Sequence, residues 1–442
     1  MMRKSILVIA LMIAALPAVA QPEKPKPTAA VDKPKKVQVT PYGFVRNYFN
    51  YDSRNMYTVI GGEYDMLPYD ANMSDGVDLN DVSQAHLLAI SSRVGLRLSG
   101  PMLGNAATSG CIEGDFGGFG TTNTVMRIRL AYMQLDWRNE NYTTNLLIGQ
   151  DWHPLSGNIM PDVLGMAAGA PFRPHSRTPQ VRLTYTLGNG LGASMAALYQ
   201  LQYMYNGPQD TNIHVSTAST AFANKAIVPE MFFGLHYRKG KIYTQLGADV
   251  QTLRPRNFGA DPLSGNTVRV DETLTSITPT FYFQYLDGKF GLKCRTMLAR
   301  NTSHLNQLNG YAIVGANADG SYDYAPLNAS ISYLNISYGS KWKGNIFLGY
   351  MKNLGAGQDL YADAAGNNFI FMKGGEAFTH LNSLWRIAPS ISFNLSYINL
   401  GLEYEMTAAT YGDRASDGSI LLNDNLRNIV NHRICMLARY NF

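Results

Sequence analysis

Side chains that could do chemistry are concentrated between residues 151 and 178. This segment carries two histidines, two carboxylates and two arginines on either side of a small, apolar stretch at 165–171. Imidazole and carboxylate groups can hold a metal ion or transfer protons, and guanidinium groups can bind anions. The six candidate residues are Asp151, His153, Asp162, Arg173, His175 and Arg177.

Two kinds of chemistry are disfavoured in this segment. The histidines and aspartates could share a metal ion, but their spacing is not that of a known metal site. Ser156 and Ser176 lie near the histidines, as a Ser–His–Asp hydrolase would require, yet nothing around them resembles a nucleophile elbow. We therefore expect no metal, no other cofactor and no enzymatic activity.

A second set of charges recurs at alternate positions, which is the spacing of one face of a β-strand. In 125–133, for example, Arg127, Arg129 and Met133 share one face and Ile128 lies on the other. Arginine faces lipid only at a large cost in free energy, so the arginine face is expected to line the interior of a barrel. The interior charges expected on this basis are Arg93, Arg97, Glu113, Asp115, Arg127, Arg129 and Arg182.

These interior charges have two interpretations. Guanidinium groups in a narrow aqueous gap attract anions and orient dipolar solutes. Alternatively, Arg127 and Arg129 pair with Glu113 and Asp115 as structural charges. We expect the cluster as a whole to act in permeation. The charged ends of the 151–178 segment are expected to line a constriction opposite the wall arginines.

The rest of the chain has the pattern of a barrel. Tight turns, such as those at 187–190 and 287–288, alternate with long polar connections, as in outer-membrane barrels. No segment after the N-terminal region is a continuous apolar run of helix-spanning length, so a membrane protein with this sequence must close a barrel. We predict an all-β fold, a transmembrane antiparallel β-barrel of about sixteen strands, with eighteen as the alternative and 374–386 as one strand. The 151–178 segment is expected to fold inward as a constriction loop.

Composition narrows the functional class further. The 442 residues carry a net charge of +5, and much of the excess lies near the N-terminus, so nucleic-acid binding is not indicated. The three cysteines are an odd number without metal-like spacing, which argues against a disulfide framework.

Three regions are expected along the chain. Residues 1–20 have the basic start, apolar stretch and small-residue site of a secretory signal peptide. Residues 21–38 are rich in Pro and Lys and predict an extended periplasmic linker. Residues 39–442 form the transmembrane β-barrel. Its last strand alternates apolar residues up to Tyr440 and Phe442, which matches the C-terminal signal for membrane insertion of bacterial barrels.

Several segments resemble the DcaP-like porins, a family of trimeric outer-membrane channels. The matching text is Thr124–Tyr132, Asn145–Trp152 and Arg177–Tyr185, with similar text at Tyr42–Arg46 and Leu384–Phe442. The likeness touches both ends and the middle of the chain. The likeness ends at the N-terminus. The family carries an extension there that can form a coiled coil, whereas residues 21–37 of this chain are Pro-rich and have no heptad repeat.

The resemblance implies a sixteen-stranded homotrimer in the outer membrane of a Gram-negative-type bacterium. Such a channel would admit small hydrophilic solutes, often anionic, by passive diffusion. Its other expected partners are outer-membrane lipid and lipopolysaccharide. The alternative is a plugged barrel that acts through its long surface loops as an adhesin or receptor.

Overall fold

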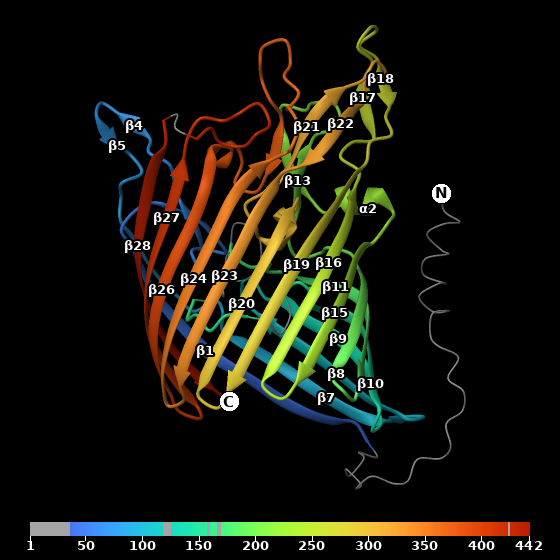
Figure 1. The fold of residues 1–442 in the computed structure, drawn as a ribbon, viewed down its shortest axis with the longest axis vertical. Helices are drawn as coiled ribbons and strands as arrows, with labels where there is room; N and C mark the ends of the chain where they lie inside the picture. Colours follow the sequence, from blue (N-terminus) through green and yellow to red (C-terminus); the bar gives the residue numbers. More distant parts are fainter. Residues whose placement is uncertain (1–35, 118–124, 157–159, 166–168, 423–424) are drawn as a thin grey trace.

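The chain forms a closed antiparallel β-barrel (Figure 1). The computed structural model describes residues 36–117, 125–156, 160–165, 169–422 and 425–442. The predicted signal peptide and most of the predicted linker lie outside these residues. No helix in the described part is long and apolar enough to cross a membrane.

The barrel is built from seventeen hydrogen-bonded strands. Because β6 and β7 both pair with β1, they act as one interrupted strand, and the barrel has the expected sixteen. The strands are β1 (Gln38–Asp52), β6 (Gln84–Leu88), β7 (Arg93–Leu103), β8 (Ala106–Asp115), β9 (Arg127–Arg138), β10 (Tyr142–Trp152), β11 (Arg177–Leu187), β12 (Leu191–Leu198), β15 (Glu230–Lys239), β16 (Ile242–Leu253), β19 (Leu274–Asp287), β20 (Phe290–Arg300), β23 (Asn328–Gly339), β24 (Trp342–Gly355), β26 (Leu381–Asn394), β27 (Ile398–Tyr411) and β28 (Arg427–Asn441).

The barrel closes where β1 pairs with β28. The register runs from Phe44 opposite Asn441 to Asp52 opposite Arg433. The backbone of Gly43 also exchanges two hydrogen bonds with Phe442, each 3.1 Å long. Closure leaves no unpaired strand edge, which is the condition for a β-sheet to cross a membrane.

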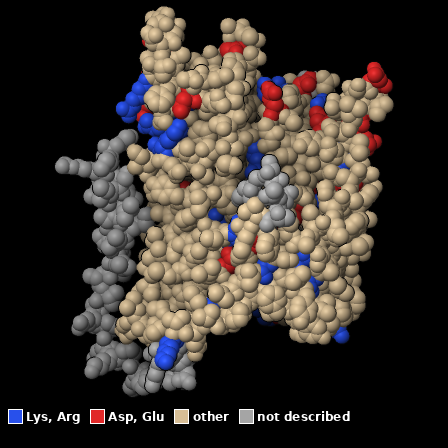
Figure 2. All heavy atoms as spheres, turned by 180° about the vertical axis from the view of Figure 1, so that it is seen from behind, with Lys and Arg blue, Asp and Glu red and all other residues tan. Residues whose placement is uncertain are grey.

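Every strand of the barrel presents a large apolar side chain to the outside. Figure 2 shows the result on one face, a broad belt with little charge, with charged side chains along the upper rim, at the lower edge and in one group around mid-height. Such a belt matches the hydrocarbon core of a membrane. Exposed members, one from each of the sixteen strands, are Val45, Val94, Ile112, Ile128, Ile148, Val181, Leu191, Leu235, Leu246, Ile277, Phe290, Ile336, Ile346, Ile391, Leu402 and Met436.

Two expectations for the strands are corrected. The strand predicted at 374–386 is β26, at Leu381–Asn394, and it runs through Pro389. Because proline cannot donate to the ladder, it argues against a central strand. Here Pro389 pairs with Ile346 of β24, while Ala388 and Pro389 drop out of the pairs with β27.

The second correction concerns which residues of β9 face the interior. The register between β8 and β9 skips Arg129, so a β-bulge interrupts the alternation. Ile128 and Met133, predicted to lie on opposite faces, are therefore both exposed, at 61% and 52%. Arg127 and Arg129 keep the interior positions that the alternation predicted for them.

Long connections lie at one end of the barrel and tight turns at the other (Figure 1). The long connections hold short elements of their own: β2 (Met56–Val59), β3 (Tyr64–Pro68), β4 (Met73–Ser74), β5 (Val77–Asp78), β13 (Tyr205–Pro208), β14 (Ser216–Ser219), α2 (Ala221–Ala226), β17 (Phe258–Ala260), β18 (Thr267–Arg269), η1 (Ser303–Leu305), β21 (Gly310–Ala316), β22 (Tyr322–Pro326), β25 (Ile370–Met372) and η2 (Glu376–Phe378).

Several of these connections contribute to an apolar core inside the barrel. Tyr64 and Met66 of β3 and Phe172 of the 153–176 connection are fully buried there. They share one cluster with inward side chains of the wall, such as Phe347 and Tyr333. The core therefore occupies one side of the interior at the level where the long connections enter.

Candidate functional site

The connection between β10 and β11, residues 153–176, is called the inward segment below. Its described residues contact strands on the far side of the barrel from β10 and β11. Asp162 forms ion pairs of 3.0 Å with Lys293 of β20 and Lys343 of β24. The peptide N–H of Leu164 donates to Glu403 of β27 at 3.0 Å. The described residues of the segment therefore contact the opposite wall, and the constriction expected there stays a prediction.

Two wall glycines let the inward segment approach the barrel backbone. A Cβ on Gly349 of β24 would lie 2.5 Å from the ring of Phe172. A Cβ on Gly401 of β27 would lie 2.5 Å from Leu164. A contact this short forces the neighbour to shift: at Gly401 the neighbour is the flexible end of Leu164, whereas at Gly349 it is the rigid ring of Phe172.

Replacing Gly349 by alanine is expected to lower single-channel conductance, because the added methyl group pushes Phe172 off the wall and into the lumen. The matched control is Gly344→Ala on the same strand, where the nearest atom to a new Cβ is 4.0 Å away. Conductance recorded in planar bilayers is the measurement. Equal conductance of the two variants would mean that the segment does not narrow the path.

Three of the predicted arginines gather around one ring instead of facing each other across the interior. The guanidinium carbons of Arg129, Arg173 and Arg177 lie 5.7, 5.9 and 4.7 Å from the centroid of Trp152. The expected arrangement, with the segment's arginines opposite the wall arginines, is therefore wrong for this group. Trp152 ends β10 and Arg177 begins β11, so the paired ends of these strands hold the group together.

Arg129 and the neighbouring wall arginines, Arg127 and Arg93, are paired with carboxylates. Arg129 donates from Nε to Glu113 at 2.8 Å and from Nη1 to Asp115 at 2.6 Å. Arg127 donates to Asp115 at 2.7 Å, and Arg93 lies 3.5 Å from Glu113. The geometry thus supports the structural-pair interpretation for Arg127 and Arg129.

His175 joins the inward segment to the hairpin of β2 and β3. Arg173 donates to Nδ1 of His175 at 2.8 Å, so the other ring nitrogen carries the proton and donates to the hydroxyl of Tyr64, also at 2.8 Å. Burial, followed by the positive charge of Arg173, holds the pKa of His175 well below its usual range. His175 is therefore a neutral link between two inward connections.

The other predicted residues separate into distinct contacts. Asp151 pairs with Arg182 at 2.6 Å, and Arg97 lies over the ring of Tyr42 at 4.0 Å. His153 meets Glu230 and His304, two residues that the sequence did not single out. Seven of the thirteen predicted interior residues are buried: Glu113, Asp115, Arg129, His153, Arg173, His175 and Arg177. Direct contact of these seven with a solute stays a prediction.

The serines considered for hydrolysis are engaged elsewhere. Ser156 donates to the carbonyl of Pro174 at 3.0 Å, and the hydroxyl of Ser176 bonds to the amide of Gln200. Neither hydroxyl bonds to a histidine in the described part of the chain.

Two arginines on the first and last strands, Arg46 and Arg439, were not among the predicted site residues. Arg46 of β1 lies opposite Arg439 of β28, and both lie over the ring of Phe44, at 4.4 and 5.5 Å. Arg97 lies further along the same wall, on β7 opposite Thr40 of β1. Within the described ranges, these three arginines form no ion pair with a carboxylate. The alternation of β28 already placed Arg439 inside, so the sequence held a signal for this pair.

Carboxylates dominate the same wall closer to the long connections. Arg433 pairs with Asp52 at 3.0 Å, and Arg386 pairs with Glu405 at 3.1 Å. Glu63, Asp65 and Glu403 line a small cavity with these two arginines. Carboxylates therefore outnumber arginines in this buried region beside the inward segment, and Arg46 and Arg439 lie further toward the tight turns.

Comparison with known proteins agrees with this fold. No family model and no curated protein matches the chain. Among solved structures, the outer membrane channel DcaP of Acinetobacter baumannii is similar at 18% identity and a TM-score of 0.59, over 92% of this chain and 98% of that one. A loop-deletion mutant of OmpT, an outer membrane protein of Vibrio cholerae, is similar at 10% identity and a TM-score of 0.50, over 92% and 100%.

The chain has the fold of the DcaP channel. The fold implied by the sequence resemblance is confirmed, and so is the closed barrel of sixteen strands. Together with the apolar belt, this fold places the protein in the bacterial outer membrane.

Proposed function

We propose that the protein is a DcaP-like homotrimeric porin that lets small hydrophilic solutes diffuse passively and prefers anions. The observation that carries the preference is three interior arginines that form no ion pair among the described residues: Arg46 and Arg439 at the seam, called the arginine group, and Arg97 on β7. Fixed positive charges without carboxylate partners attract anions in an aqueous passage. The binding is weak because the three side chains reach a solute one at a time as it passes, and weak binding is what allows release.

The paired charges have a different role in this proposal. Glu113, Asp115, Arg127 and Arg129 neutralise one another and hold the wall and the inward segment in position. The inward segment narrows the path, and the arginine group lies beyond it toward the tight turns. A solute entering from the side of the long connections would therefore meet the arginines only after the constriction.

The first test is single-channel recording of the purified protein in a planar bilayer under a salt gradient. We expect conductance in groups of three equal steps and a reversal potential on the anion side. Equal conductance steps with a reversal potential on the cation side would support the porin function and refute the anion preference.

A plugged barrel remains the second candidate, because the apolar core inside the barrel favours it. Residues of three connections, such as Met66, Phe172 and Phe378, share one buried cluster with the wall. Electrical silence from correctly folded protein would decide for a closed lumen. Function would then lie in the long connections, as an adhesin or receptor. Nothing in the described contacts favours an enzyme over either candidate.

A further inference from the structure

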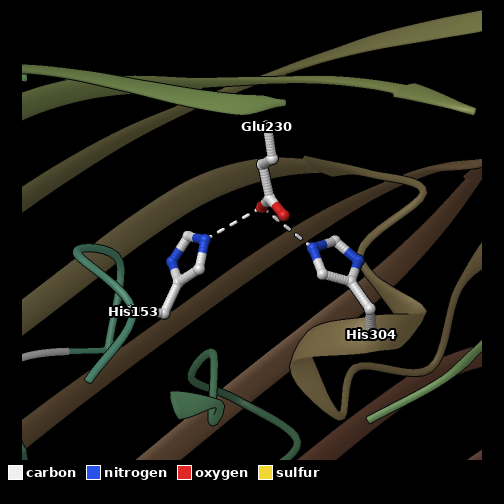
Figure 3. A group of neighbouring side chains, drawn as sticks. All are labelled: His153, Glu230 and His304. Atoms are coloured by element: carbon white, nitrogen blue, oxygen red, sulfur yellow. Dashed lines mark hydrogen bonds and ion pairs between the residues drawn. The ribbon is translucent and has the colours of Figure 1, made fainter. Parts of the chain in front are cut away.

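Two histidines meet one carboxylate where the inward segment leaves the barrel wall. His153 follows β10, Glu230 begins β15 and His304 lies in η1 (Figure 3). The Nε2 atoms of both histidines point at the same oxygen of Glu230, at 2.9 and 3.0 Å. The three potential ligand atoms lie within 4.8 Å of one another, and all three residues are buried.

A second buried carboxylate lies beside this cluster. One oxygen of Asp249, on β16, lies 3.8 Å from Nε2 of His153 and has no hydrogen-bond partner in the described part of the chain. Asp249 is 2% exposed and Glu230 is 5% exposed. Among the described residues, neither carboxylate forms an ion pair with a lysine or arginine. Two buried carboxylates without a cation are costly, and a bound metal ion would supply the missing charge.

The donor set selects a class of metal. Two imidazole nitrogens and two carboxylate oxygens suit Zn²⁺ and similar divalent transition metals. Ca²⁺ and Mg²⁺ prefer sites made of oxygen atoms only. The Glu230 oxygen lies about 3 Å from each histidine nitrogen. Atoms at this separation can all bind one ion at the usual Zn²⁺–ligand distance of about 2.0–2.2 Å.

The protons of the two imidazoles set a condition on binding. At present Nδ1 of His153 accepts from the peptide N–H of Leu155 at 3.1 Å, so Nε2 carries the proton. Coordination through Nε2 moves that proton to Nδ1, and the Leu155 N–H must turn away. At His304 the amide of Gln251 lies 3.1 Å from the ring and can rotate to accept from Nδ1. Metal binding therefore costs the hydrogen bond from the Leu155 N–H to His153. This cost disfavours cations that bind imidazole weakly.

We propose that His153, Glu230, His304 and Asp249 form a binding site for Zn²⁺ or a similar transition metal. The ion would join the start of the inward segment to β15, β16 and η1. Its effect would reach the segment's other end, because the peptide N–H of His175 donates to the carbonyl of Leu305 in η1 at 2.8 Å. The site does not depend on whether the lumen conducts.

Binding is tested with the full-length protein in detergent, stripped of metal with EDTA and titrated with Zn²⁺ by calorimetry in excess Mg²⁺. We expect one saturable site per chain and a rise in the thermal unfolding temperature. Losing a residue that only hydrogen-bonds to a metal ligand typically weakens metal binding by roughly 10–100-fold. His304→Gln removes a ligand itself, so it should weaken Zn²⁺ binding by more than that. His214→Gln is the matched control, because His214 is exposed and lies 4.0 Å from an aspartate.

A second variant covers the case in which His304→Gln does not fold. Asp249→Asn keeps both histidine bonds to Glu230 and removes only the charge of the fourth ligand, so it should fold and bind Zn²⁺ at least ten-fold more weakly. No saturable site in the wild type would overturn the proposal. Wild-type affinity in the folded His304→Gln or Asp249→Asn variants would also overturn it, and the cluster would then be only a hydrogen-bonded link.

Discussion

Replacing Arg46 and Arg439 together by glutamine is expected to move the reversal potential toward cations. Each unit charge contributes roughly 1 kcal/mol to a solute ion about 4 Å away in water-like surroundings. Two such charges favour an anion by about 2 kcal/mol at contact, so removing them should lower the anion-to-cation permeability ratio by at least roughly ten-fold. Reversal potentials under a salt gradient measure the change, and the effect should shrink at high salt, where screening shortens the reach of each charge.

The matched control for this pair is Arg269→Gln with Lys239→Gln. It removes the same net charge from exposed positions in a long connection and a tight turn. We expect its reversal potential to stay close to that of the wild type. If both double variants shift equally, selectivity follows overall charge and the arginine group has no special role.

Replacing Arg129 by methionine is expected to destabilise the barrel by about 3–5 kcal/mol, because it leaves buried carboxylates without their partner. Arg129 is the residue that bonds both Glu113 and Asp115. The free energy of unfolding from urea titration in detergent is the measurement. Arg97→Gln is the control, since Arg97 forms no ion pair in the described structure and its loss should cost about 0.5 kcal/mol or less.

A rescue experiment separates this cause from simple loss of packing. Adding Glu113→Gln and Asp115→Asn to Arg129→Met removes the unpaired charges. We expect the combined variant to recover part of the lost stability, because a buried pair replaced by neutral groups is often close to neutral. A further loss of stability would mean that the size and shape of the arginine matter more than its charge.

Alternation along the strands predicted most of the barrel, because a half-buried strand repeats every two residues wherever its ladder is regular. In the structure Arg93, Arg127 and Arg129 pair with Glu113 and Asp115 of the neighbouring strand, and their part in the passage stays a prediction. Alternation failed where the ladder is irregular: at the bulge that carries Met133 outward, and at Pro389, which β26 accommodates between two partners. Both irregularities depend on which residue of a neighbouring strand lies opposite, and a single strand's pattern does not contain that information.

The site was harder to predict than the fold, for a related reason. The sequence identified the inward segment and its charged ends, but grouped them by nearness along the chain. In the structure His153 belongs with Glu230 and His304, and Asp162 belongs with Lys293 and Lys343. These partners come from strands far along the chain, and they meet only when the barrel closes. Arg46 and Arg439 were missed because they lie on the two strands that join the ends of the sheet.

The seam between β1 and β28 has a consequence for the order of folding. Its partners, such as Arg46 and Arg439, are separated by almost the whole chain, and contacts between distant residues form slowly. We expect hairpins joined by tight turns to form early and the seam to form last. Until then both seam strands would keep free edges that invite pairing with other chains. The time between export and closure is thus when this protein is most exposed to aggregation, and when a chaperone bound to the first or last strand would protect it most.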